Sequence, residues 1–321
     1  MPQRLPLAAQ EFADAWFRYG CSPAMFHKAT GYAERAIYAR RNEVEKQLGI
    51  SLPSVKQTTS GGTPKVAINV GYHRRHALKA KDGSVVVFSD AHWWPGQKRA
   101  KAHEALLNLL PELKPRAVIA NGDVFDGAGM SRHDPGGWEG RPSTEDELAV
   151  LQSNMREIEE AAGGAALLRT IGNHDIRFDK YLAVRASEMR GVSGSRLRDH
   201  LPRWLESWSV EINGECMVKH RWHQGIHATY NNTLKGGMSI VTAHMHRLQA
   251  TAHTDYRGRR WGVDCGTLAD GPGSPQFAYA EDNPAPWGSG FAVLTWRNGV
   301  LLPPEFCEVI KGKAWFRGEA V

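Results

Sequence analysis

The sequence predicts an α/β protein with two packed β-sheets flanked by helices, preceded by a small all-α domain. Three observations lead to this prediction. Apolar strand-like runs alternate with helical segments from residue 84 to residue 171, which is typical of βαβ units. Short strands joined by Asn-Gly turns follow from residue 209. Residues 8–48 show only helical spacing, and a stretch rich in Ser, Thr, Gly and Pro separates them from the remainder.

We therefore divide the chain into a helical domain (1–54), a linker with a basic strand (55–82) and a main domain (83–321). Hydrophobic residues at 41% and charged residues at 23% describe an ordinary globular protein. A formal net charge of +6 permits a polyanionic partner without requiring one. The four cysteines form no CxxC pair, so we expect reduced thiols and a cytoplasmic protein. No stretch has the apolar length of a signal peptide or a membrane span.

The helical domain has the pattern of a helix-turn-helix. Aromatic residues recur at helical spacing over residues 8–19, and Ser22 followed by Pro23 predicts the start of a short helix. A glycine turn and a longer basic helix over 32–48 complete the pattern. The segment resembles the helix-turn-helix domains of phage and bacterial DNA-binding proteins.

Three side chains of the longer helix project away from its apolar stripe: Arg35, Tyr38 and Asn42. In a helix-turn-helix protein such residues face the major groove of DNA. The alternative is a helical subdomain with a solvated charged face. We favour DNA binding.

The remaining elements are predicted in order. Strands are expected at 66–70, 85–88, 117–120 and 165–168, at 209–212, 215–220, 238–243, 247–256 and 259–265, and at 290–296 and 299–302. Helices are expected at 97–110, closed by Pro111, from Ser143 to about Ala162, and within 178–205.

Polar side chains follow the ends of several predicted strands. They are Asp90, His92, Asp123, Asn173, His174, His220, His244 and His246. The Asp-x-His and His-x-His spacings put two side chains on the same side of an extended backbone. Carboxylate, imidazole and amide groups without thiolates suit manganese, iron or zinc. These groups are too many for one ion, and two ions held close together clamp a phosphoryl oxygen.

In this order the motifs resemble those of the calcineurin-like metallophosphoesterases. The motifs are Asp90-x-His92, Gly122-Asp123, Gly172-Asn173-His174-Asp175, His220 and His244-x-His246, over about residues 84–270. The resemblance implies a calcineurin-like β-sandwich flanked by helices, with four αββα layers. It also implies two divalent ions, manganese first, with iron, zinc or nickel as alternatives.

The resemblance also implies a role for each residue. Asp90, His92 and His246 would hold one ion, Asn173, His220 and His244 the other, and Asp123 would bridge them. His174 would face the phosphate, stabilise the transition state and help protonate the leaving oxygen. Asp175 would orient His174.

Two departures from the family pattern concern the ligands. Ala243 stands where the family usually has glycine, which matters only if that position needs a positive φ. Arg221 follows His220 in place of glycine, and His223 is the alternative ligand. His227 is expected to line the substrate pocket or to cap a helix.

Other residues near the motifs leave two interpretations open. Asp126 is interpreted as a turn cap, and Trp93 and Trp94 as packing residues more than base-stacking ones. Arg132 and His133 lie in a long loop, where they contact a substrate phosphate or are merely exposed.

Three functions fit these features. A nuclease, delivered to DNA by the helical domain, is the first. A phosphomonoesterase acting on a nucleotide or phosphoprotein is the second. A DNA-binding regulatory protein with an incidental phosphoesterase domain is the third, and the complete ligand set argues against it. The partner is therefore expected to be nucleic acid, and no membrane contact is expected.

Overall fold

The computed structural model describes residues 7–50, 52, 73–132, 140–271 and 274–321. The strand predicted at 66–70 and most of the predicted linker lie outside these residues. The α-helices are α1 (Ala9–Arg18), α2 (Pro23–Thr30), α3 (Glu34–Leu48), α4 (Lys101–Leu113), α5 (Thr144–Ala162), α6 (Asp175–Arg185) and α7 (Ala228–Gly236). Short 3-10 helices are η1 (Ala128–Met130), η2 (Ser187–Met189), η3 (Leu197–His200) and η4 (Pro275–Ala280).

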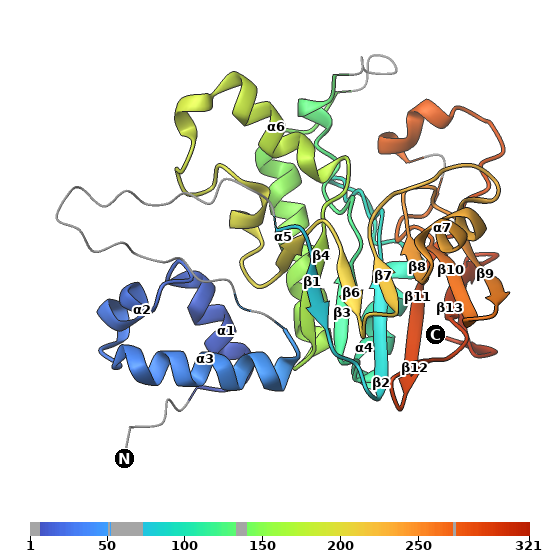
Figure 1. The fold of residues 1–321 in the computed structure, drawn as a ribbon. Coiled ribbons are helices and arrows are strands. Elements are labelled where there is room, and N and C mark those ends of the chain that lie inside the picture. The colour runs from blue at the N-terminus through green and yellow to red at the C-terminus, as the bar shows by residue number, and fades with distance from the viewer. Residues whose placement is uncertain (1–6, 51, 53–72, 133–139, 272–273) are drawn as a thin grey trace.

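The strands form two sheets (Figure 1). The nine-stranded sheet contains β2 (Gly83–Phe88), β3 (Ala117–Ala120), β4 (Ala166–Thr170), β5 (Leu205–Ser207), β11 (Gly290–Arg297), β12 (Val300–Leu301), β13 (Glu305–Ile310), β14 (Lys313–Phe316) and β15 (Glu319–Ala320). The six-stranded sheet contains β1 (His76–Leu78), β6 (Val210–Ile212), β7 (Cys216–Val218), β8 (Ser239–Thr242), β9 (Leu248–Asp255) and β10 (Gly258–Cys265). Strands β2 to β5 run parallel, so their carboxyl ends meet at one edge.

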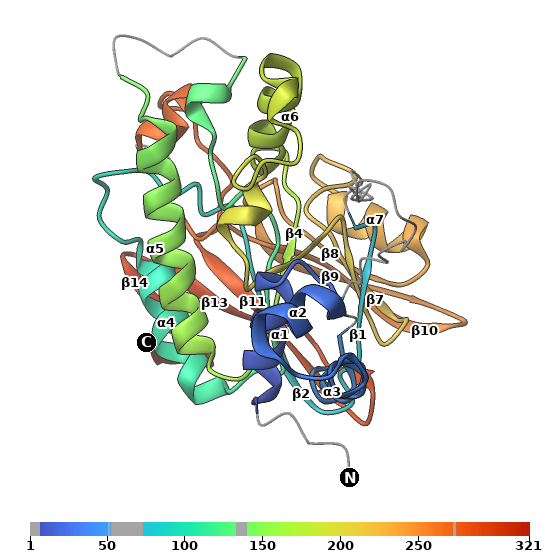
Figure 2. The same cartoon turned by 90° about the vertical axis from the view of Figure 1, so that its left-hand side faces the viewer.

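Alternate side chains of each buried strand enter two different cores. On β2, Val85 and Val87 belong to the core between the sheets, whereas Val86 and Phe88 pack under α4 and α5. Helix α7 covers the outer face of the other sheet, where Thr229 Oγ1 lies 2.8 Å from Thr251 Oγ1 of β9. The result is a four-layer arrangement of helices, two sheets and helices, which confirms the predicted α/β class (Figure 2).

The three N-terminal helices pack on one another and on the sheets. Phe12 of α1 stacks on Phe26 of α2, with ring centroids 5.2 Å apart, and the Arg41 guanidinium of α3 lies over the Trp16 ring. Asp14 Oδ2 is 3.2 Å from Arg203 Nε, just before β5. The helices and both sheets share one continuous hydrophobic core. The helices lie near the amino ends of β4 and β5.

The turns at Asn213-Gly214 and Asn298-Gly299 are confirmed. Both residues of each turn have positive φ, as a tight hairpin turn requires. The helix predicted at 97–110 is confirmed, but its ends differ: α4 runs from Lys101 to Leu113 and holds Pro111 in its last turn instead of ending before it. Strands β1 and β5, helix α7 and the C-terminal strands β13 to β15 were not predicted.

Within the described part of the chain, no helix is both long enough and apolar enough to cross a membrane.

Candidate active site

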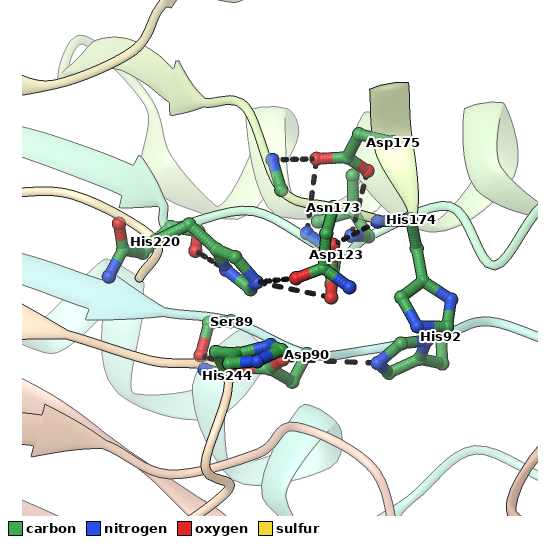
Figure 3. A network of polar contacts seen from close by, with 12 residues as sticks. Ser89, Asp90, His92, Asp123, Asn173, His174, Asp175, His220 and His244 are labelled. Atoms are coloured by element: carbon green, nitrogen blue, oxygen red, sulfur yellow. Dashed lines mark hydrogen bonds and ion pairs between the residues drawn. The ribbon is translucent and has the colours of Figure 1, made fainter. Parts of the chain in front are cut away.

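Polar side chains from both sheets converge where the strands end (Figure 3). Among the described residues, three groups have donor atoms within 4.8 Å of one another. Asp90, His92 and His246 form the first, Asp123, His220 and His244 the second, and His92, Asp126 and His174 the third. The first two, which hold the predicted ligands, follow β2, β3, β7 and β8, so both sheets contribute to each of these two ligand groups. The structure thus brings together the residues that were proposed as ligands.

The backbone at these residues differs from the extended geometry expected for the Asp-x-His and His-x-His pairs. Left-handed φ angles occur at five ligands: Asp90 (+49°), His92 (+42°), Asp123 (+52°), His244 (+72°) and His246 (+56°). Each pair therefore lies in a tight loop beyond its strand. The alternation of side chains along an extended backbone does not explain why the two side chains of a pair reach the same place. Such conformations cost free energy in non-glycine residues and are typical of functional sites.

The first group fits a divalent cation. The Asp90 Oδ1 atom is buried and has no hydrogen-bond donor, although His246 Nε2 lies 3.2 Å away and His92 Nε2 3.8 Å away. The other oxygen, Oδ2, accepts hydrogen bonds from Ser89 Oγ at 2.7 Å and His244 N at 3.0 Å. A metal ion bound by these three residues would satisfy this buried carboxylate oxygen.

In the second group, His220 Nε2 lies 3.1 Å from Asp123 Oδ2 and 3.1 Å from Asn173 Oδ1. Its Nδ1 is 2.8 Å from the Asn121 carbonyl, so a proton there leaves Nε2 as the ligand atom. The alternative, His223, stacks on Trp222 and belongs to neither group. The geometry therefore favours His220.

The carboxylates of both groups are held ionised. Burial by itself would raise the pKa of Asp123, but His220 lowers it below the usual range of an aspartate. Burial would likewise lower the pKa of His220, but the Asp123 carboxylate raises it to about 9, so a metal ion that bound Nε2 would displace a proton. A buried concentration of negative charge attracts cations.

Two glycines let the loops approach closely. A Cβ atom on Gly172 would lie 2.0 Å from Asp123 Oδ1, and one on Gly122 would lie 2.6 Å from His220 Nδ1. Ala243, in contrast, does not have a positive φ, and its N–H donates to the His220 carbonyl at 2.8 Å. The departure from glycine at this position is therefore accommodated.

His174 lies beside the first group and is partly exposed. Its Nδ1 is 3.0 Å from Asp126 Oδ1, and its ring meets that of His92 with centroids 4.5 Å apart. Asp126 Oδ1 also lies 2.9 Å from His92 Nδ1. Asp126 is thus more than a turn cap, since one carboxylate orients both histidines. Arg177 Nη2 is 3.2 Å from His174 Nε2, and this arginine was missed although it lies one helical turn beyond His174.

The role predicted for Asp175 needs correction, because its carboxylate does not orient His174. Its oxygens accept hydrogen bonds from the backbone N–H groups of Gly172, Asp123, Val124 and Phe125. Arg169 Nη1 lies 3.3 Å from Asp175 Oδ2, and this arginine also pairs with Glu206. Asp175 therefore fixes the backbone that presents Asp123.

The other predicted contacts lie outside the two ligand groups. Arg132 is exposed, and His133 falls outside the described residues. His227 is exposed at the N-cap position of α7, but its side chain makes no capping hydrogen bond. Arg35, Tyr38 and Asn42 are exposed on α3. Gln224, which the sequence did not point to, lies with Nε2 3.0 Å from His244 Nε2.

Glu147, beneath this region on α5, supplies a pH-dependent prediction. Its Oε1 accepts a hydrogen bond from Ala128 N at 3.2 Å, and burial raises its pKa from 4.5 to about 7. The unfolded chain therefore loses this proton before the folded protein does, so the free energy of unfolding falls as pH rises from 4.5 to 7. In Glu147→Gln this fall is absent, and at pH 8 the variant should be more stable by about 2 kcal/mol. Urea unfolding in chelator across this pH range measures the difference, which must vanish below pH 4.5.

The fold presents two groups of His and Asp side chains that could hold divalent metal ions. Residues 83–259, more than half of the chain, match the family described as calcineurin-like phosphoesterase. The chain belongs to this family. A search of curated proteins finds no match.

Solved structures that are similar to this chain share little sequence with it. A single mutant of Vps29 from Entamoeba histolytica is 15% identical, with a TM-score of 0.39, covering 74% of this chain and 99% of that one. Wild-type Vps29 from the same organism, complexed with zinc, is 16% identical, with a TM-score of 0.39 and coverage of 74% and 98%. An archaeal phosphodiesterase is 12% identical, with a TM-score of 0.35 and coverage of 70% and 99%.

Proposed function

We propose that the protein is a nuclease that hydrolyses phosphodiester bonds of DNA with two divalent ions, manganese being our first choice. The observation that carries the proposal is the pair of candidate metal-ligand groups, in a chain whose helix α3 also exposes Arg35, Tyr38 and Asn42. Two bound ions supply the Lewis acidity and activated water that phosphoester hydrolysis needs. One ion would be held by Asp90, His92 and His246, the other by Asn173, His220 and His244, with Asp123 between them.

His174, Asp126 and Arg177 provide the protein's own chemistry. The Asp126 carboxylate lies 3.0 Å from His174 Nδ1 and orients the ring, which we propose as the group that gives a proton to the leaving oxygen. Arg177 carries positive charge beside His174 and can attract a phosphate oxygen. Asp175 keeps the Asp123 loop in the geometry that this arrangement needs.

The helical domain would act as a targeting device. It packs near the amino end of β4, whereas Asn173 and His174 follow the carboxyl end of that strand. DNA bound to α3 would therefore bring the enzyme to its substrate without itself positioning the scissile bond. We also propose a cytoplasmic location, because the four cysteines are unpaired, as in reducing compartments.

Hydrolysis of four substrates tests the proposal: single-stranded DNA, duplex DNA, a small phosphodiester and a small phosphomonoester, each with manganese and with chelator. Manganese-dependent cleavage of DNA is expected. Turnover of the monoester alone would instead indicate a phosphatase. DNA binding without any metal-dependent turnover would indicate a regulatory protein.

A double variant, Arg35→Ala with Asn42→Ala, should weaken DNA binding about tenfold or more, because it removes a phosphate or base contact at each position. The salt dependence of binding should also become shallower. Turnover of a small phosphodiester should not change, since α3 lies away from the catalytic loops. Fluorescence anisotropy at several salt concentrations measures the binding.

Arg18→Ala is the matched control, because it removes an exposed positive charge from α1. An equal loss of affinity in this control would mean that the charge of the domain, and not the α3 face, attracts DNA. Wild-type affinity in the double variant would refute DNA recognition by α3.

A further inference from the structure

A cleft of about 520 Å³ opens beside the first metal-ligand group. Its wall begins at Ala91, which stands between the ligands Asp90 and His92, and continues along α4 and α5. The residues that matter for its chemistry are Trp93, Trp94, Lys98, His103, Asn154 and Gln276. The volume is within the range of pockets that hold small ligands the size of a nucleotide.

The two tryptophans of this cleft differ in their surroundings. Trp93 packs against the hydrophobic core under α4, and its ring lies 5.5 Å from that of His103. Trp94 belongs to neither hydrophobic core among the described residues, although its side chain is only partly exposed. Packing in the hydrophobic core therefore explains the position of Trp93 but not that of Trp94. The indole ring of Trp94 lines the cleft without packing in a core, so its face can stack on a ligand.

The polar lining suits a base and a phosphate. His103 is buried, its Nε2 has no hydrogen-bond partner, and burial lowers its pKa to about 4, so its neutral ring can donate or accept. The amides of Gln97 and Gln276 exchange hydrogen bonds of 3.0 and 3.2 Å across the rim. Arg99 is paired with Glu157, whereas Lys98 is exposed and makes no ion pair with any residue that the structure describes.

We propose that this cleft binds the unpaired nucleobase next to the scissile phosphate, with Trp94 as the stacking surface and Lys98 beside the adjoining backbone phosphate. This inference rests on the proposed nuclease function and specifies its substrate. A base within a duplex is paired and stacked and cannot enter a cleft beside the catalytic loops. The enzyme should therefore prefer single-stranded nucleic acid, which proteins bind by combining stacking with positive charge.

The test compares Trp94→Ala with wild type on a single-stranded oligonucleotide and on the same oligonucleotide with abasic positions. Loss of one stacked base should raise KM for the normal strand about 5- to 100-fold, with little change in kcat. The abasic strand should show no such difference between the two proteins. Trp94→Phe should restore most of the affinity, because phenylalanine keeps a stacking face. Trp315→Ala, an exposed tryptophan on β14, is the control.

Metal content must be equal in all variants, since Trp94 lies close to His92. If wild type cleaves DNA and Trp94→Ala matches it in KM, the cleft inference is wrong and the nuclease proposal stands. If wild type cleaves no nucleic acid, the nuclease proposal fails. Calorimetric titration with a phosphorothioate dinucleotide then decides the cleft separately: binding that Trp94→Ala loses supports it, and equal or absent binding overturns it.

Discussion

Asp123→Asn should lose at least one bound metal ion and lower kcat by roughly 1,000-fold or more, because we propose this carboxylate as the ligand shared by both ions. Its Oδ2 lies 3.1 Å from His220 Nε2, and its Oδ1 accepts the His174 N–H at 2.7 Å. Asparagine has the same shape and keeps an acceptor oxygen, but it lacks the negative charge that a shared ligand provides. The change therefore tests charge and coordination with little change in packing.

Metal content after dialysis, measured by mass spectrometry, should fall together with turnover. Asp282→Asn removes an exposed carboxylate far along the sequence from the ligand loops and is the matched control. A thermal unfolding curve recorded in chelator shows whether the variant folds. An Asp123→Asn protein that retains two ions and wild-type turnover would contradict the assignment of Asp123 as the shared ligand.

The candidate ligands could be proposed from the sequence because parallel strands bring their carboxyl ends to one edge. A polar residue directly after each buried strand therefore reaches the same place, whatever the conformation of the loop. The loop conformation itself could not be predicted. Nothing in the letters Asp90 or His246 indicates a left-handed φ, which is imposed by contacts such as the hydrogen bond from Asp90 N to the Gly122 carbonyl at 3.0 Å.

The prediction that Asp175 orients His174 was wrong for a similar reason. Asp175 is adjacent in sequence, but it begins α6, and successive side chains on a helix diverge by about 100°. Its carboxylate therefore turns toward the loop at Asp123, while Asp126 approaches His174 from another strand end. The role of Arg169 could not be predicted from the sequence either, because it is one charged residue within an apolar strand. Only the folded structure reveals that Asp175 and Glu206 lie beside it.

The second large effect is expected at His174, which we propose as a general acid and not as a metal ligand. His174→Ala should lower kcat for DNA by about 10²- to 10⁴-fold, the usual contribution of a positioned general acid, while both ions remain bound. His174 contacts Asp126 and Arg177, and neither residue belongs to the two ligand groups proposed here for the ions. Kinetic assays on the metal-loaded variant, with metal content measured in parallel, test this expectation.

The leaving group shows whether His174 acts as the acid. An alkoxide leaving from DNA needs a proton, whereas p-nitrophenolate leaves readily without one. If His174 donates that proton, the loss in kcat for His174→Ala should be large for DNA and at least tenfold smaller for a p-nitrophenyl diester. Equal losses on both substrates would mean that His174 stabilises charge on the phosphoryl group instead. Asp126→Asn, compared at equal metal content because Asp126 also contacts His92, should show the same dependence on the leaving group, since its carboxylate orients the His174 ring.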